Sequence, residues 1–123
     1  IIQKAYEKDT CAVVLSAMQG TTDALIEIGR SAENGDEKFR GQVKTIAEKH
    51  FEAVRNLIPK NSQKIIHNFI ESQISELEKI CEGVFLLREL TARTLDRIVS
   101  FGEILSTRIV SAKFDSMHIE NVW

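Results

Sequence analysis

The chain has 123 residues, of which 43% are hydrophobic and 28% charged, and its formal net charge is −2. This composition is typical of a globular protein, and the length suits one domain with a modest core. Basic and acidic residues are interspersed and aromatic residues make up 7% of the chain, so we expect no nucleic-acid binding. The apolar runs are far shorter than the roughly 20 residues of a membrane span, and no signal-peptide pattern opens the chain, so we expect no membrane association.

The first elements predicted along the chain are the end of a helix over residues 1–7 and a strand over Cys11–Leu15. The strand prediction rests on an unbroken apolar run with two valines, which is typical of a central strand covered on both faces. A loop over residues 16–20 follows. Thr21 or Thr22 can then cap a helix, because a hydroxyl can accept hydrogen bonds from the free amides of the first turn.

Further helices are predicted from apolar residues at spacings of three and four. Asp36 caps the first of them and Pro59, the single proline, stops it. Asn61 or Ser62 caps the next, and Thr91 caps the last. The predicted ranges are 36–57, 62–80, 84–90 and 91–114, with a second short strand at 118–122.

The chain is therefore expected to be mostly α-helical with two short strands. Two strands do not make a stable sheet by themselves, so the apolar strand over Cys11–Leu15 implies neighbours from a larger α/β domain. Ile1 and Ile2 open the chain without a cap, and Trp123 closes it where the second strand begins. We expect the chain to be a fragment.

The last predicted helix carries a carboxylate in apolar surroundings. At 100° per residue, Asp96, Ser100, Glu103 and Thr107 form a polar lane beside the apolar stripe that contains Gly102. A buried unpaired carboxylate is costly, so Glu103 needs a cation or donors. A glycine in mid-helix costs about 1 kcal/mol relative to alanine and lets something approach closely. The alternative is a surface carboxylate at the edge of the core.

The loop after the first strand is the second candidate. Ligands of open α/β sheets collect beyond the carboxyl ends of the strands. Ser16, Thr21 and Thr22 lie at such an end, beside free amides that can hold an anion. Ordinary loop and cap chemistry is the alternative.

The remaining reactive side chains favour plain structural roles. Cys11 and Cys81 are expected to be reduced, buried thiols. His67 and Glu71 are one helical turn apart, but one such pair makes no metal site, and a solvated pair is the simpler interpretation. Ser16 has no local histidine partner that would indicate acyl transfer.

Two motifs resemble those of one enzyme family. The first is Val-Val-Leu-Ser-Ala-Met-Gln-Gly-Thr-Thr-Asp at residues 13–23, and the second is Ser-Phe-Gly-Glu-Ile-Leu-Ser-Thr at residues 100–107. Both are similar to aspartate kinases, in which the second has the form Ser-x-Gly-Glu-x-Leu-Ser, and the intervening Gly-Val-Phe-Leu-Leu-Arg-Glu-Leu at 83–90 also resembles that family. The resemblance covers essentially the whole chain in order and spacing.

The resemblance implies an amino-acid-kinase fold and a transfer of the phosphoryl group of MgATP to the β-carboxylate of L-aspartate. It implies that Thr22 and Glu103 bind aspartate, with Glu103 attracting the substrate ammonium. It also implies that Ser16 and Ala17 lie next to the reacting carboxylate. The intact enzyme is expected to be a cytoplasmic homo-oligomer, either monofunctional or fused to homoserine dehydrogenase.

The chain departs from the family by what it lacks. The family's Lys-Phe-Gly-Gly-Thr-Ser strand and loop for the ATP phosphates, its later Gly-Gly-Ser-Asp loop and its nucleotide pocket have no counterpart in the sequence. Residues 1–123 are therefore expected to be part of the catalytic domain, to bind no ATP or Mg²⁺ and to be inactive alone. The rival hypothesis is a helical interaction module without a catalytic role.

Overall fold

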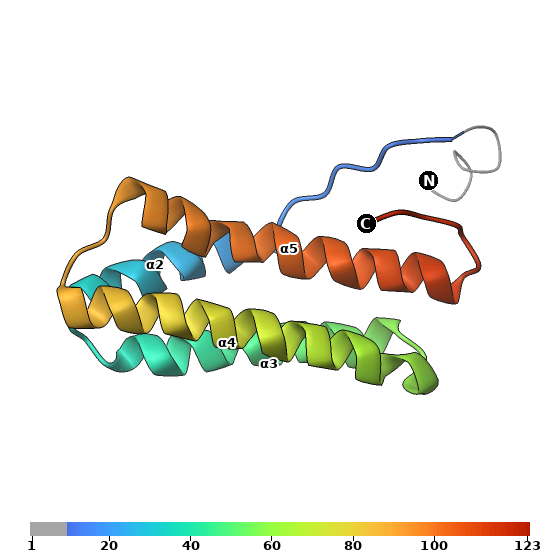
Figure 1. Ribbon diagram of the computed structural model, residues 1–123. Coiled ribbons are helices and arrows are strands. Elements are labelled where there is room, and N and C mark those ends of the chain that lie inside the picture. Colours follow the sequence, from blue (N-terminus) through green and yellow to red (C-terminus); the bar gives the residue numbers. More distant parts are fainter. Residues whose placement is uncertain (1–9) are drawn as a thin grey trace.

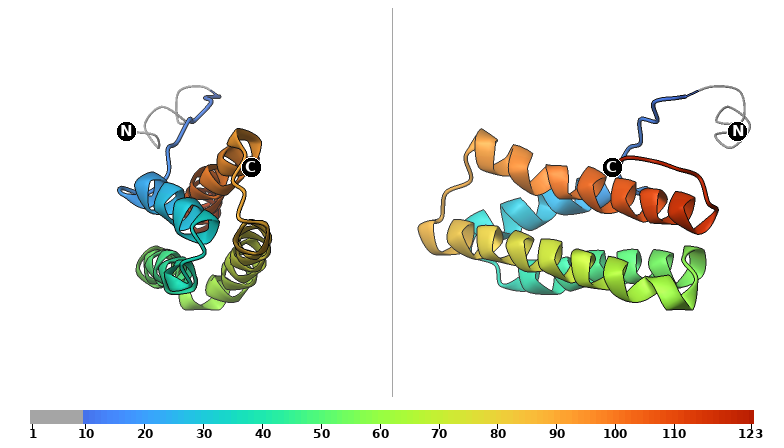
Figure 2. Two further views of the ribbon diagram at one scale, coloured as in Figure 1. Left: turned by 90° about the vertical axis from the view of Figure 1, so that its left-hand side faces the viewer. Right: turned by 45° about the vertical axis from the view of Figure 1, so that its right-hand side comes forward.

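The computed structural model describes residues 10–123, which form a bundle of four α-helices and a short 3-10 turn, η1 (Figure 1). Each α-helix contacts the other three, and a view along the bundle shows them around one core (Figure 2). The predicted helix end over residues 1–7 lies outside the described residues. The elements are α2 (Thr21–Glu33), α3 (Lys38–Leu57), η1 (Lys60–Ser62), α4 (Gln63–Leu87) and α5 (Ala92–Ser116).

The apolar stripes predicted from the sequence form the core of this bundle. Each helix directs one face inward because its apolar residues recur every three or four positions. The larger fully buried residues come from all four helices, and they include Leu25, Ile28, Phe39, Val43, Ile70, Leu77, Ile98, Phe101 and Leu105. The helical part of the fold prediction is therefore correct.

The ends of the helices follow the sequence in some places and depart from it in others. The Thr91 hydroxyl accepts a hydrogen bond from the Thr94 amide at 3.1 Å, which confirms the predicted cap of α5. Pro59 follows the end of α3 as predicted. The helical continuation predicted over 84–90 is correct as far as Leu87 and wrong beyond it, because α4 runs unbroken to Leu87 and ends at Arg88 in a left-handed conformation with φ 56°. Ser62 precedes α4 without a side-chain cap.

The two predicted strands are wrong, because the described residues contain no strand. Residues 11–15 are extended but make no backbone hydrogen bond to another segment of the described chain. Val14 is 96% exposed and Cys11 is exposed, so the predicted burial of this run and of the Cys11 thiol is also wrong. A strand needs a partner backbone at about 4.8 Å, and no described segment supplies one. The Cys81 thiol is buried, as predicted, and burial raises its pKa to about 12.

Both extended segments lie on the outer side of α5, away from α3 and α4 (Figure 1). One runs from residue 10 into α2, and the other follows α5 from residue 117 to the end of the chain. Across residues 10–123, none of the helices combines the length and apolar character that crossing a bilayer requires. Helix α5 therefore has the other helices of the bundle on one side and the two extended segments on the other.

Candidate functional site

The loop between the extended segment and α2 packs directly on the middle of α5. The Ser106 hydroxyl donates a hydrogen bond to the Ser16 carbonyl oxygen at 2.9 Å. One turn before Ser106, Gly102 faces Ala17. Two parts of the chain separated by 90 positions are thus joined by a hydrogen bond, and they belong to the two motifs that the sequence singled out.

Gly102 is the residue that allows this approach. A Cβ atom built on Gly102 would lie 2.8 Å from the Ala17 Cβ, 3.4 Å from Leu25 Cδ1 and 3.5 Å from Thr21 Cγ2. Real Cβ atoms do not approach another carbon to 2.8 Å, because dispersion is optimal near 3.5–4.0 Å and repulsion rises steeply below it. The prediction that something lies close to this glycine is therefore correct, and the neighbour is the Ala17 loop.

The start of α2 differs from the prediction. Gly20, with φ 75°, is the residue before the helix, and no side chain caps it, so the predicted capping by Thr21 or Thr22 is wrong. Thr21 is fully buried, and its hydroxyl has no hydrogen-bond partner among the described residues. Glycine suits this position because φ > 0 places no Cβ in collision. Thr22, half-buried, occupies the second position of the helix.

The first turn of α2 offers backbone amide donors. The amide of Thr21 donates to Met18 and that of Ala24 to Gly20, whereas no described acceptor is recorded for the amides of Thr22 and Asp23. The positive end of the helix dipole adds to the attraction for negative charge. The Lys49 ammonium also reaches this loop, where it donates to the Gln19 carbonyl oxygen.

Glu103 lies on α5 between the two positions that contact the loop. Its side chain is half-buried, as the sequence predicted, and among the described residues its carboxylate makes no ion pair. Its backbone carbonyl accepts a hydrogen bond from the Thr107 hydroxyl at 2.7 Å. The structure therefore places Ser16 and Ala17 beside the turn of α5 that carries Glu103, and leaves that carboxylate available for a cation from outside the described chain.

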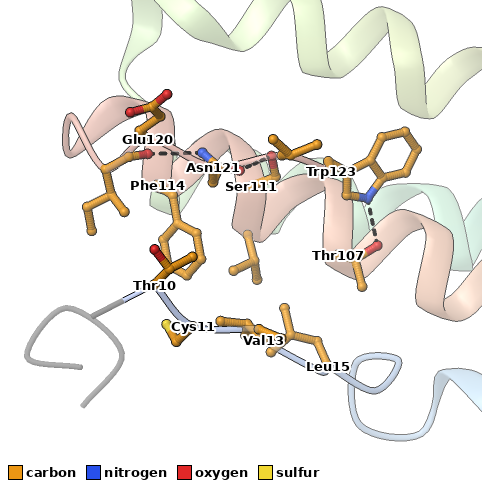
Figure 3. A pocket seen from close by; sticks show the side chains of 14 residues that line it. Thr10, Cys11, Val13, Leu15, Thr107, Ser111, Phe114, Glu120, Asn121 and Trp123 are labelled. Atoms are coloured by element: carbon orange, nitrogen blue, oxygen red, sulfur yellow. Dashed lines mark hydrogen bonds between the residues drawn. The ribbon is translucent and has the colours of Figure 1, made fainter. Parts of the chain in front are cut away.

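A cavity lies farther along α5 and is distinct from the contact between the Ser16–Ala17 loop and α5. It has a volume of about 670 Å³ and lies between the two extended segments and the stretch of α5 from Thr107 to Phe114 (Figure 3). The Trp123 indole N–H donates to the Thr107 hydroxyl at 2.9 Å, and the Ser111 hydroxyl donates to Asn121 Oδ1 at 2.6 Å. The predicted residues Ser16, Ala17, Thr22 and Glu103 do not line it. Thr107, one turn from Glu103, is where the cavity comes closest to them along the helix.

The sequence missed two features of this region. The motif that contains Ser106 predicts no role for it, although its polar side chain is only 6% exposed, and a buried hydroxyl needs a partner. Nothing in the sequence predicts a contact of Trp123, whose ring packs edge-on against Phe69 with centroids 5.3 Å apart, while the Arg108 guanidinium lies 5.5 Å from its centre. The spacing of the motif could have revealed Ser106; nothing local could have revealed the contact of Trp123.

The described residues contain no group of three or more His, Cys, Asp or Glu side chains that could hold a metal ion. His67 Nδ1 lies 3.5 Å from a Glu71 carboxylate oxygen on the exposed side of α4, which confirms the solvated pair. The His67 ring also stacks on Phe51, with centroids 4.2 Å apart. This histidine therefore has a structural explanation.

The chain is similar in sequence to aspartokinases. It is 31% identical over 118 residues to Aspartokinase 1, chloroplastic, of Arabidopsis thaliana, covering 94% of this chain and 20% of that protein. It is 35% identical over 108 residues to Aspartokinase 2, chloroplastic, of the same plant, covering 88% of this chain and 19% of that protein. A bifunctional aspartokinase/homoserine dehydrogenase of Buchnera aphidicola is 29% identical over 120 residues, and the match covers 94% of this chain and 14% of that protein.

No protein-family model matches the chain. The chain spans about one fifth of the length of the two plant aspartokinases. The aligned region of the first relative nevertheless extends over 94% of this chain, and so spans both motifs on which the resemblance rests. The resemblance is thereby confirmed, and the chain corresponds to one segment of an aspartokinase.

Proposed function

We propose that this chain is part of the amino-acid-kinase catalytic domain of an aspartate kinase and supplies residues that bind L-aspartate. The intact enzyme would transfer a phosphoryl group from MgATP to the substrate's β-carboxylate. The observation that carries the proposal is the contact of the Ser16–Ala17 loop with the turn of α5 that bears Glu103. In a chain related to aspartokinases, this contact joins the two segments to which the resemblance assigns aspartate.

Each predicted residue has a physical role in this proposal. Glu103 opposes the substrate ammonium, because it is a half-buried carboxylate without a described partner. Thr22, in the first turn of α2, offers a hydroxyl and a free amide to a substrate carboxylate. Ser16 and Ala17 line the approach to the reacting group. The nucleophile is ionised at neutral pH, so the reaction needs positioning and neutralisation of charge rather than a general base.

ATP and Mg²⁺ fall to other parts of the intact enzyme in this proposal. The described residues offer no cluster of carboxylates suited to a cation, and the sequence has no glycine-rich loop of the kind that cradles phosphates. We therefore propose that the 123-residue chain alone has no aspartate-dependent ATP turnover. We also propose that the intact enzyme is a homo-oligomer that acts in the cytoplasm, whereas the plant relatives are named as chloroplastic.

The test is Glu103→Gln in the intact polypeptide that contains this chain. The amide keeps the size of the side chain but loses the charge opposite the ammonium, which should cost about 2–3 kcal/mol, or roughly 30- to 150-fold in kcat/KM for aspartate. The KM for ATP should change little. Glu48→Gln is the matched control, because Glu48 is an exposed carboxylate on α3, and it should leave both constants unchanged.

Two results would contradict this proposal, and the first of them would favour the rival hypothesis of a helical interaction module. One is the absence of aspartate-dependent ATP turnover in the unsubstituted intact polypeptide. The other is an equal shift, or no shift, in the constants for aspartate and ATP in Glu103→Gln. In the second case Glu103 would have a structural role only.

A further inference from the structure

We propose that Ser106 and Gly102 are positioning residues that fix the Ser16–Ala17 loop on α5 and so set where the reacting carboxylate of the substrate lies. The proposal rests on the proposed function. It adds two residues that do not themselves contact the substrate. Their effect on the reaction is exerted through the loop.

The hydrogen bond from Ser106 holds residue 16 of the loop on α5. It joins the Ser106 hydroxyl to the Ser16 carbonyl oxygen, and it is the one hydrogen bond that the described residues make to residues 11–17. The same hydroxyl lies 3.2 Å from the Glu103 carbonyl oxygen. A hydroxyl has one hydrogen to donate, so the two carbonyl oxygens compete for it, and the shorter contact is the one to Ser16 of the loop.

Gly102 sets the depth of the same contact. The 2.8 Å separation between a Cβ at Gly102 and the Cβ of Ala17 leaves no room for a methyl group. On the other side, Leu25 Cδ1 and Thr21 Cγ2 close the space at 3.4 and 3.5 Å. Any side chain at position 102 must therefore push the loop away from α5, because Leu25 and Thr21 are fully buried and have little room to retreat.

Glu103 lies on the same turn of α5 as the two residues that hold the loop, so the packing of the loop affects the geometry of the proposed aspartate site. Glu103 follows Gly102 directly and precedes Ser106 by less than one turn, so one rigid helix carries the ammonium-binding carboxylate and the two contacts that hold the loop. The separation between the two ends of the bound aspartate is thereby fixed by α5. A displacement of about 1 Å in such a geometry can reduce the rate about 100-fold.

The experiment uses exchanged methyl groups in the intact polypeptide. Gly102→Ala adds a methyl group that overpacks the contact with Ala17. Because the displaced loop moves the reacting carboxylate, kcat/KM for aspartate should fall about tenfold or more. Adding Ala17→Gly removes the opposing Cβ and should recover part of the kcat/KM lost in Gly102→Ala, so that the double variant is more active than the single one. The control is Gly41→Ala, because a Cβ at Gly41 meets none of the described residues within 4 Å, and it should have no effect.

Ser106→Ala is the second variant. Loss of one hydrogen bond should lower kcat/KM for aspartate about three- to tenfold, with the KM for ATP unchanged. Ser116→Ala is its control, because the Ser116 hydroxyl donates to the Lys113 carbonyl oxygen of its own helix and ties no loop to α5 among the described residues. Circular dichroism of each variant establishes that it is folded, and Ser106→Ala decides the question where Gly102→Ala does not fold.

The outcomes separate this inference from the proposed function. An unsubstituted polypeptide without aspartate-dependent turnover contradicts the proposed function itself. An active polypeptide in which Ser106→Ala and Gly102→Ala behave like their controls contradicts only the positioning role. Equal losses for aspartate and ATP, with no restoration by Ala17→Gly, would also overturn it, because they indicate general damage to the bundle.

Discussion

The free energy of unfolding of this chain should fall as the pH is lowered from 7 to 5.5, because of His50 in α3. His50 is fully buried. Its Nδ1 lies 2.7 Å from the Ile46 carbonyl oxygen, which can only accept, so Nδ1 carries the proton. Its Nε2 has no described partner. A second proton would therefore place a charge and an unpaired N–H in the core.

Burial lowers the pKa of His50 below its ordinary value of 6.5, the hydrogen bond to the Ile46 carbonyl raises it, and the charge of Lys49 lowers it further. The unfolded chain then binds more protons than the folded chain below pH 6.5, so stability is retained above that value and lost as the pH falls. The slope reaches about 1.4 kcal/mol per pH unit for one proton. A histidine that stays neutral in the folded state would thus cost at most about 1.3 kcal/mol between pH 7 and 5.5.

Urea unfolding followed by circular dichroism at the two pH values measures this difference. His50→Leu should remove most of the pH dependence, because leucine fills the site without a titrating group. His118→Asn is the control, since His118 is exposed and its φ of 56° suits asparagine; it should keep the pH dependence. Equal losses of stability on acidification in His50→Leu and in the unsubstituted chain would show that His50 is not the titrating group.

Two further predictions concern the bundle itself. Phe101→Ala should destabilise the chain by about 3–5 kcal/mol, because Phe101 is fully buried and its truncation leaves a cavity. Leu86→Ala is the control: its side chain is 71% exposed, so stability should change by less than about 0.5 kcal/mol. Similar urea midpoints for the two variants would refute the assigned core. Thr91→Ala should cost about 1 kcal/mol through loss of the cap on α5, and Thr91→Ser, which keeps the hydroxyl, should cost much less; an equal loss in both would show that the hydroxyl contributes nothing.

The helices could be predicted from the sequence because their hydrogen bonds are local. The spacing of residues such as Val43 and Ile46 specifies which side of α3 faces inward, whatever the other helices do. Gly83 does not interrupt α4: a Cβ there would meet nothing within 4 Å among the described residues, so this glycine marks neither a turn nor a close contact. It costs helix stability, but packing of Cys81 and Val84 keeps α4 continuous.

The absence of strands could not be predicted because the stability of a strand depends on partners far away in the sequence. The apolar run at Cys11–Leu15 has strong β propensity, but propensity in a strand reflects packing against neighbours. In the described chain no neighbour supplies a hydrogen-bonded ladder, and Val14 remains exposed. The same apolar pattern would be buried or exposed according to its surroundings, so the sequence of the run alone does not decide between the two.

The candidate site was accessible from the sequence because it contains residues that are costly where they stand. Gly102 lowers the stability of its helix, and a half-buried carboxylate at Glu103 lowers it again. The structure accounts for the first cost, because Ala17 occupies the space that a side chain would need. It does not account for the second, since no described cation approaches Glu103. On the proposed function, the ammonium group of the substrate supplies the positive charge that Glu103 lacks. Binding of aspartate then offsets the loss of stability caused by the half-buried carboxylate. The carboxylate contributes to affinity because the folded chain leaves it unpaired.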